Sequence, residues 1–283
     1  MIQELKNNNI NDLISWGRQS LLKYNIDNAQ NEIEWFLCFL LNCNRAYLHL
    51  HYDKLIHNDI QNKFQNMVKR RINGEPFQYI IGYATFYGRD FYVNSNVFIP
   101  RPETELIIDR LKSIKKIESL LDICTGTGCI AITSYLENIT TNIMAIDISP
   151  ATIKLAKLNM KKFGVKNINF QIHNFITTPF NIKFDVIVCN PPYIPKKDLK
   201  NLQNEVIHFE PSLALSDNKD GLSFYKKLSE SFSKLVNPNG KMLLEFGGNE
   251  QQPDIDNIFK TKNLSTKYYK DLQNEYRIVE ITQ

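Results

Sequence analysis

The chain reads LLDICTGTGCIAI at residues 120–132, and this stretch decides the fold class. A short apolar run typical of a buried strand leads into a turn with Gly126 and Gly128, and a second apolar run then indicates a helix. Glycines at such a turn let the backbone approach a ligand, and the N-terminus of the helix favours a carboxylate or a phosphate. The fingerprint G-x-G-x-x-G is incomplete because Ala131 stands at its last position, and no P-loop Gly-Lys-Ser/Thr follows. The stretch predicts a ligand-binding turn in an α/β fold, with an ordinary tight turn as the alternative.

Short apolar runs alternate with helical patterns from about Ser119 to the end of the chain. This alternation is typical of a parallel sheet that carries helices on both faces. Two apolar runs around a polar turn close the chain, and they predict a final antiparallel pair at 264–269 and 276–281. The other predicted elements are strands at 120–124, 143–147, 168–172, 185–189 and 241–246 and helices at 129–137, 150–163 and 221–235.

An acidic residue ends the second predicted strand. Asp147 follows Gly128 by 19 residues, which is the place where doubly wound nucleotide sites carry an acid that accepts both ribose hydroxyls. The alternative is an N-cap for the helix near Pro150, although Ser149 suits that position better. Together the turn and Asp147 predict an adenosine-containing ligand, and they do not separate a dinucleotide from S-adenosylmethionine.

The fourth predicted strand runs into the tetrapeptide Asn190-Pro191-Pro192-Tyr193. The prolines make a stiff, extended turn at the carboxyl edge of the sheet, where open α/β folds bind ligands. The Asn190 side-chain oxygen and the Pro191 carbonyl can accept both hydrogens of a planar –NH2 group, while the Tyr193 ring packs on its flat face. The alternative is a proline-stabilised turn with a core tyrosine, and the glycine turn and Asp147 nearby favour the functional interpretation.

The N-terminal part of the chain has a different pattern. Residues 1–73 place apolar side chains at helical spacing, as at Ile33, Phe36 and Leu37, and predict a small helical domain. From Gly74, glycines separate aromatic and β-branched runs such as 79–81 and 91–93, which predict a β-hairpin linker over 74–102. Residues 103–283 then form the predicted α/β domain.

Composition narrows the class of protein further. The 283 residues carry a net charge of +4, too mild for the basic stripe of a nucleic-acid-binding surface. The five cysteines include no CxxC pair, which argues against a disulfide framework or a zinc site, so no metal is expected. No apolar run reaches the roughly 18–20 residues of a membrane span, and the N-terminus lacks a signal-peptide core, so the expected location is the cytoplasm.

The combined motifs resemble the HemK/PrmC family of protein-(glutamine-N5) methyltransferases. The turn at 120–132 and the Asn-Pro-Pro-Tyr tetrapeptide are similar to those of class I S-adenosylmethionine-dependent methyltransferases that act on exocyclic or amide nitrogens. The similarity to the family extends over nearly the whole chain. It includes the runs GEPFQYIIG at 74–82, FYG at 86–88, IPRPETE at 99–105, FEP at 209–211, AL at 214–215, DGL at 220–222 and LE at 244–245.

The resemblance implies a fold and an activity. The fold is a class I (Rossmann-like) α/β domain with a seven-stranded, mostly parallel sheet, preceded by a helical substrate-recognition domain and the hairpin linker. The activity is methyl transfer from S-adenosyl-L-methionine to the glutamine of the Gly-Gly-Gln motif in class-1 peptide chain release factors, a step of protein methylation linked to translation termination. The expected partner is the release factor, with no membrane and no direct nucleic acid required.

The resemblance also implies roles for particular residues. The implied cofactor-binding residues are Cys124, Thr125, Gly126, Thr127, Gly128, Asp147, Phe175 and Asn190. The implied substrate clamp is Asn190, Pro191, Pro192 and Tyr193, of which Asn190, Pro191 and Tyr193 are the catalytic candidates. Two departures stand out: Cys124 lies where many members have glycine, and 173–175 read His-Asn-Phe in place of a common acid–aromatic pairing.

Two other functions remain open from the residues themselves. The same tetrapeptide serves nucleic-acid N-methyltransferases that act on adenine or guanine amino groups, although flipping a base out of a helix calls for a more basic surface. A non-catalytic binding module with this fold would need a broken clamp or a blocked turn, and the sequence has neither. The sequence leaves two roles undecided: Arg101 reaches the cofactor cleft or braces the linker, and Glu245 lies near the site or is a fold element.

Overall fold

A computed structural model describes residues 9–283. The chain forms two compact units, the first of which comprises the described residues up to Gly82 together with Asn204–Phe209. The second comprises Tyr83–Gln203 and Glu210–Gln283. The domain boundaries that the sequence suggested, at 73 and 102, stay a prediction. Within 9–283, no helix has both the length and the apolar character needed to cross a membrane.

Amphipathic helices build the first unit, and their apolar faces meet in a common core. Gly17 allows the closest approach, since a Cβ there would lie 2.7 Å from Ile33 Cδ1 and 3.0 Å from Phe64 Cζ. These three residues come from different helices, so the glycine lets α1 pack directly on its neighbours. The helices are α1 (Ile10–Leu22), α2 (Ala29–Leu41), α3 (Arg45–Leu50), α4 (Asn58–Ile72), α5 (Phe77–Ile81) and α9 (Asn204–Phe209).

One part of the predicted hairpin is helical instead. The run Tyr79-Ile80-Ile81 lies in α5, although its side chains favour strands. Pro76 begins this helix, and Gly82 ends it in the left-handed region at φ 82°. A proline before a helix and a glycine after it are ordinary helix boundaries, and here they outweigh the propensity of the three residues between them.

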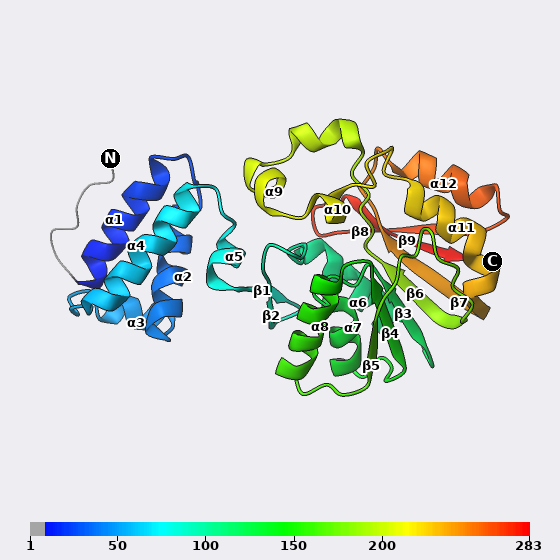
Figure 1. The fold of residues 1–283 in the computed structure, drawn as a ribbon, viewed down its shortest axis with the longest axis horizontal. Coiled ribbons are helices and arrows are strands. Elements are labelled where there is room, and N and C mark those ends of the chain that lie inside the picture. The colour runs from blue at the N-terminus through cyan, green and yellow to red at the C-terminus, as the bar shows by residue number, and fades with distance from the viewer. Residues whose placement is uncertain (1–8) are drawn as a thin grey trace. The chain divides into compact units, whose positions relative to one another are not determined.

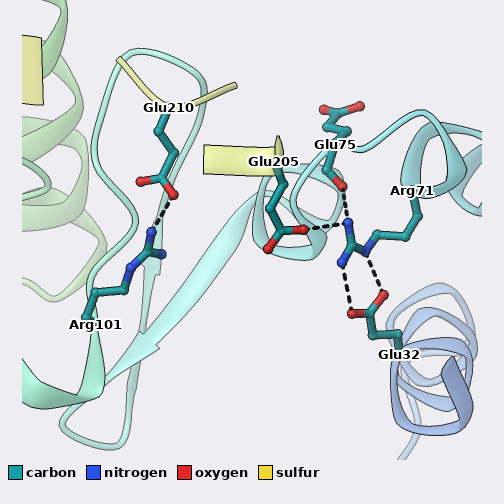
Figure 2. A network of polar contacts seen from close by, with 6 residues as sticks. All are labelled: Glu32, Arg71, Glu75, Arg101, Glu205 and Glu210. Carbon is teal, nitrogen blue, oxygen red and sulfur yellow. Dashed lines mark hydrogen bonds and ion pairs between the residues drawn. The ribbon is translucent and has the colours of Figure 1, made fainter. Parts of the chain in front are cut away.

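A buried arginine holds α9 in the first unit. Arg71 of α4 pairs with Glu32 of α2 through Nε and Oε2 at 2.7 Å, and with Glu205 of α9 through Nη1 and Oε2 at 2.7 Å. Figure 2 shows both carboxylates around the one guanidinium, with the Glu75 main chain also in contact. Phe209 at the end of α9 lies beside Gly74. A short segment, 204–209, which is far in sequence from the rest of this unit, therefore completes it.

The second unit begins with a hairpin of β1 (Tyr83–Phe86) and β2 (Arg89–Tyr92). Tyr87 and Gly88 make its turn, both with positive φ, as a two-residue hairpin loop requires. Phe86 and Phe91 are fully buried, and their rings meet edge to face at 6.1 Å. The predicted hairpin is thus present, but it starts at Tyr83.

A seven-stranded sheet follows, in the order β5-β4-β3-β6-β7-β9-β8 (Figure 1). The pairs β5–β4, β4–β3, β3–β6 and β6–β7 are parallel, and β9 is antiparallel to both β7 and β8. The expected sheet, with its final antiparallel pair, is confirmed. The strands are β3 (Leu120–Ile123), β4 (Ile143–Asp147), β5 (Ile168–Ile172), β6 (Phe184–Cys189), β7 (Val236–Glu245), β8 (Ser265–Lys270) and β9 (Tyr276–Thr282).

Helices cover both faces of this sheet and bury a core on each. Along β6, Val186 and Val188 enter the core beneath α6, α7 and α8, whereas Ile187 and Cys189 enter the core beneath α11 and α12. This two-residue alternation is what a strand buried on both faces requires. The elements are η1 (Pro102–Thr104), α6 (Glu105–Lys112), α7 (Cys129–Leu136), α8 (Pro150–Lys162), η2 (Lys196–Asn201), α10 (Ser212–Leu215), α11 (Ser223–Leu235) and α12 (Gln252–Lys260).

Candidate active site

A cavity of about 510 Å³ lies at the carboxyl ends of the parallel strands, wholly within the second unit. Its size falls in the range of roughly 300–1,000 Å³ typical of small-molecule sites, and its walls are mostly apolar. The segments that line it are Ser95–Pro100 in part, Thr104, the turns after β3, β4 and β5, the residues after β6, and parts of 211–224. The position is where open α/β sheets bind ligands.

The turn after β3 forms one wall. Cys124, Thr125, Gly126 and Thr127 all line the cavity. The hydroxyl of Thr125 donates to the buried Asp122 carboxylate at 2.5 Å, and the Thr125 amide donates to the Ile146 carbonyl at 3.0 Å. The turn is therefore fixed to both β3 and β4.

Gly128 and Cys124 have roles that the sequence did not specify. Gly128 does not line the cavity: it begins α7 at φ 80°, and a Cβ there would lie 3.1 Å from Ile132 and from Phe170. It therefore serves the packing of α7. Cys124 has φ 60°, in the left-handed region that favours glycine, which explains why glycine is the common residue at this position in the family that the sequence resembles.

Asp147 reaches across from the end of β4 to the same turn. One carboxylate oxygen accepts from the Gly126 amide at 3.1 Å, and the other accepts from the Ser149 amide at 3.0 Å. Burial raises the pKa of Asp147. The residue lines the cavity and is not the N-cap of α8, because Ser149 accepts from Thr152 in that position. Each oxygen keeps a second lone pair for a ligand hydroxyl.

The wall after β5 is aromatic. Phe175 is buried at the cavity and stacks on Phe224 with ring centroids 6.4 Å apart. His173 lies beside it, and its Nε2 is buried without a hydrogen-bond partner among the described residues. A flat, apolar surface with one unsatisfied polar atom suits a heteroaromatic ring.

The Asn-Pro-Pro-Tyr corner forms the opposite wall, and all four residues line the cavity. The Asn190 side-chain nitrogen donates to the Thr104 hydroxyl at 3.2 Å. Among residues 9–283, the structure shows no hydrogen bond to the Asn190 side-chain oxygen or to the Pro191 carbonyl. Two acceptor oxygens at one corner of the cavity are thus available to a ligand.

Contacts of its main chain hold Tyr193 in place. Its carbonyl accepts from the Gln251 side chain at 3.0 Å and touches Gly221, where a Cβ would lie only 2.1 Å away. Tyr193 also pairs with Ser216 as an isolated β-bridge. Burial raises the pKa of its phenol, whose hydroxyl lies 3.4 Å from Glu245 Oε1. The phenol therefore stays protonated and donates to that carboxylate.

Two fully buried carboxyl groups support the site from behind. Burial raises the pKa of Asp122, at the end of β3, to about 7, and it raises the pKa of Glu245, at the end of β7, also to about 7. Neither lines the cavity. Glu245 lies directly behind the Asn-Pro-Pro-Tyr corner. It is therefore near the site, which decides between the two roles that the sequence left open for it.

Arg101 braces the linker, and this decides between the two roles that the sequence left open for it. Its guanidinium pairs with the buried Glu210 (Figure 2) and lies over the Phe98 ring, 4.6 Å from the centroid. Glu210 also accepts from the Ile99 amide at 3.2 Å. Arg101 is not among the cavity-lining residues, whereas Thr104 is. Sequence reasoning missed Thr104 as a site residue, although it lies in the IPRPETE run.

Comparisons with known proteins agree with this architecture. The family model described as "PrmC N-terminal domain" matches residues 12–82. The family model described as "Methyltransferase domain" matches residues 114–281. A crystal structure of a methyltransferase from Pyrococcus furiosus superimposes with a TM-score of 0.53 at 18% identity, covering 80% of this chain and 98% of that one. The fold is therefore that of the methyltransferases, and the chain is a methyltransferase.

The sequence relatives show to which family of methyltransferases the chain belongs. A release factor glutamine methyltransferase from Geobacter sulfurreducens is 35% identical and covers 84% of each chain, and one from Bacillus cereus is 36% identical over 83% of this chain and 85% of its own length. A bifunctional methyltransferase from Rickettsia prowazekii is 37% identical over 77% of this chain, which spans only 46% of that protein. The chain belongs to the release factor glutamine methyltransferase family.

Proposed function

We propose that this protein transfers a methyl group from S-adenosyl-L-methionine to the side-chain amide nitrogen of the glutamine in the Gly-Gly-Gln motif of class-1 peptide chain release factors. The observation that carries this is the pair of available oxygens, Asn190 Oδ1 and the Pro191 carbonyl, at one corner of a cavity whose other walls suit an adenosine. A primary carboxamide offers two N–H donors that match them. The family of the sequence relatives supports the choice of substrate. We also propose a cytoplasmic location, because translation termination takes place there.

The cavity suits the cofactor residue by residue. Asp147 would accept from the ribose hydroxyls, the aromatic wall at Phe175 would take the adenine, and the turn 124–127 would hold the amino-acid part at the N-terminus of α7. A Cβ at Gly126 would have no atom nearer than 4.0 Å, so the main chain there leaves space for a ligand. When bound, S-adenosylmethionine supplies an electrophilic methyl group.

The corner would act by orienting a weak nucleophile. The nitrogen of a carboxamide is poorly nucleophilic because its lone pair is delocalised into the carbonyl. Asn190 and Pro191 would hold its two hydrogens and stabilise the positive charge that grows on nitrogen as the N–C bond forms and the C–S bond breaks. The nitrogen then loses one proton to solvent. Alignment of this kind contributes up to about 7–11 kcal/mol, and one critical preorganised dipole about 3–4 kcal/mol.

The helical unit would recognise the protein substrate. Its match to the PrmC N-terminal domain supports a role distinct from the chemistry, because the cavity lies wholly in the other unit. We therefore propose that the helical unit and the hairpin bind the folded release factor, while the second unit binds the cofactor and clamps the glutamine.

Transfer of a labelled methyl group tests the substrate class. The purified protein is incubated with methyl-labelled S-adenosylmethionine and, separately, a class-1 release factor, ribosomal RNA, transfer RNA and duplex DNA. We expect label in the release factor alone, and none when its Gly-Gly-Gln glutamine is replaced by alanine. Label in a nucleic acid would support the N-methyltransferase alternative, and cofactor binding without any transfer would support a binding module.

A further inference from the structure

Positive charge is concentrated in one segment of the chain. Between Asp147 and Asp185 the sequence has six lysines and no aspartate, glutamate or arginine. The rest of the chain has a slight excess of acidic residues, so the net charge of +4 arises entirely from this segment. The whole-chain value therefore understates the charge of this part of the protein. The lysines are Lys154, Lys157, Lys161, Lys162, Lys166 and Lys183.

Three of these lysines form a row on α8. Lys154, Lys157 and Lys161 follow one another at spacings of three and four residues, which places them on one side of the helix. All three are exposed, and none of them lines the cavity. Among residues 9–283, the structure shows no ion pair to any of the three. We call this row the lysine face. At a rise of about 1.5 Å per residue, it is about 10 Å long.

The opposite side of α8 is buried. The helix packs on β4 and β5, and β5 is an outermost strand of the sheet (Figure 1). Ile153, Leu155 and Ala156 are all buried on that side. A helix that binds a membrane surface inserts its apolar side among the lipids, and here that side is already covered by protein. The lysine face is thus the part of α8 that is open to a partner.

An exposed aromatic ring lies beside the C-terminal half of α8. Asn159 of α8 fixes Tyr92 of β2, because its Oδ1 accepts from the Tyr92 amide at 2.7 Å and its Nδ2 donates to the Tyr92 carbonyl at 3.1 Å. The Lys162 ammonium lies over the Tyr92 ring, 4.4 Å from the centroid. Tyr92 is nevertheless 45% exposed. Positive charge and a flat ring are therefore held next to each other.

The chemistry of this surface matches a strand of nucleic acid. A row of charges about 10 Å long is not neutralised by one small anion, whereas a strand offers successive phosphates. An exposed ring stacks on an unpaired base of any sequence. Interfaces between proteins, by contrast, are depleted in lysine and enriched in arginine, and the segment has no arginine. These features favour a single strand over an acidic protein.

We propose that the lysine face of α8 and Tyr92 dock single-stranded RNA, with the lysines on phosphates and the ring on a base. The choice of RNA over DNA rests on the proposed function, because translation termination takes place on ribosomes, which consist largely of RNA. The RNA is a docking partner and not the methyl acceptor, since the lysine face lies outside the cavity.

Fluorescence anisotropy with labelled oligouridylate of about 20 nucleotides tests the lysine face. The full chain carrying Lys154→Gln, Lys157→Gln and Lys161→Gln should have a Kd at least about tenfold higher than wild type. The slope of log Kd against log salt should fall by about 2, since each phosphate contact on a single strand contributes about 0.7.

Three exposed lysines elsewhere in the same unit provide the matched control. Lys200→Gln, Lys234→Gln and Lys262→Gln remove the same charge, and their combination should leave the Kd within about threefold of wild type. An equal loss of affinity in the two triple variants would overturn the proposal, because total charge rather than the lysine face would then determine binding.

Tyr92 is tested by a change that leaves the charge untouched. Tyr92→Leu should raise the Kd about fivefold or more with an unchanged salt slope, because it removes only the stacking surface. Tyr24→Leu, at a tyrosine that is 47% exposed, should bind as wild type does. Wild-type affinity in Tyr92→Leu would refute the assignment to a single strand.

Other polyanions distinguish the kind of partner. Duplex RNA of the same length, polyglutamate, and vesicles of phosphatidylglycerol and phosphatidylcholine are titrated at the same ionic strength. We expect each to bind at least about tenfold more weakly than the single strand. Tighter binding of polyglutamate would overturn the proposal in favour of an acidic protein, and tighter binding of the vesicles in favour of a membrane.

Methyl transfer separates this inference from the proposed function. With labelled S-adenosylmethionine, the variant of the lysine face should methylate the isolated release factor within about twofold of the wild-type rate, and the bound RNA should gain no label. If wild type methylates no release factor but the RNA affinities differ as expected, the proposed function fails and the docking surface stands. Normal methylation with RNA binding that does not depend on the lysine face would refute the inference alone, and label in the RNA would refute its docking role.

Discussion

Asn190 and Asp147 line the same cavity, and we propose that they bind different molecules there. Asp147 accepts a hydrogen bond from Gly126 in the turn after β3. In the proposed function Asp147 binds the ribose of the cofactor, whereas Asn190 binds the substrate carboxamide. The two residues should therefore affect different kinetic constants when each is changed to alanine.

The expected result is a split between binding and turnover. Asp147→Ala should weaken the cofactor Kd about 10- to 100-fold, the cost of lost hydrogen bonds to a charged group. Asn190→Ala should lower kcat about 100- to 1,000-fold with a nearly unchanged Kd. Calorimetric titration and initial rates measure the two constants. Equal losses of Kd and kcat in Asn190→Ala would argue against the clamp, and an unchanged Kd in Asp147→Ala would remove the ribose assignment.

We expect Asp122 to make the free energy of unfolding depend on pH. Its folded pKa of about 7 lies above the ordinary 3.8, so the folded state binds more protons and loses stability as the pH rises toward 7. Between pH 5 and pH 8 the wild type should lose about 3 kcal/mol of unfolding free energy relative to Asp122→Asn. Urea unfolding at both pH values measures this. Asp254→Asn, at an exposed site on α12, should follow the wild type, and parallel behaviour of Asp122→Asn would contradict the assignment.

At the scale of elements, the corner after β6 depends on a glycine from another segment. Gly221 has φ 78° and lies against the Tyr193 carbonyl, so Gly221→Ala must displace the tetrapeptide. We expect a loss of stability of about 2–4 kcal/mol from overpacking and backbone strain, and a kcat lowered about a hundredfold by the displaced clamp. Unfolding and rate measurements on the same protein test both effects.

Gly164 offers the matched control for this substitution. It also has positive φ, 67°, but a Cβ there would meet nothing within 4 Å. Gly164→Ala should therefore cost only the backbone strain, about 1–2 kcal/mol, with kcat within twofold of wild type. If the two variants behaved alike, close contact at Tyr193 would not be the cause.

Helix α9 shows how an element can depend on a partner far away in sequence. Arg71→Met leaves Glu32 buried without its partner and releases Glu205, and we expect a loss of about 3–5 kcal/mol in unfolding free energy. Arg71→Met with Glu32→Leu removes both charges and should recover most of it. Urea unfolding and limited proteolysis at 204–209 report the two consequences. A loss below about 1 kcal/mol in the single variant would show that Arg71 does not hold the helix.

The sequence predicted the elements whose signals are local. The apolar run at 120–123 and the glycines after it were sufficient for β3 and the start of α7, and Ser149 for the cap of α8. The predictions failed where a side chain's partner is remote. Thr104 meets Asn190 across 86 positions, and nothing near either residue indicates that contact. The run at 79–81 failed for a different reason, because its boundaries outweighed its propensity.

At the scale of the molecule, we propose that chemistry and recognition belong to separate units. Every residue that lines the cavity belongs to the unit with the sheet, and the helical unit carries the match to the PrmC N-terminal domain. Under this proposal, the helical unit would supply the selectivity for one protein partner, and the cavity would need to recognise only a flat carboxamide.

Mass spectrometry of the release factor tests the central claim most directly. The full chain, S-adenosylmethionine and an unmethylated class-1 release factor are incubated together, and the peptide with the Gly-Gly-Gln motif is fragmented. The account predicts a mass gain of one methylene on the side chain of that glutamine, abolished in Asn190→Ala. A methyl group on any other residue, or an unmodified glutamine in the presence of bound cofactor, would contradict it.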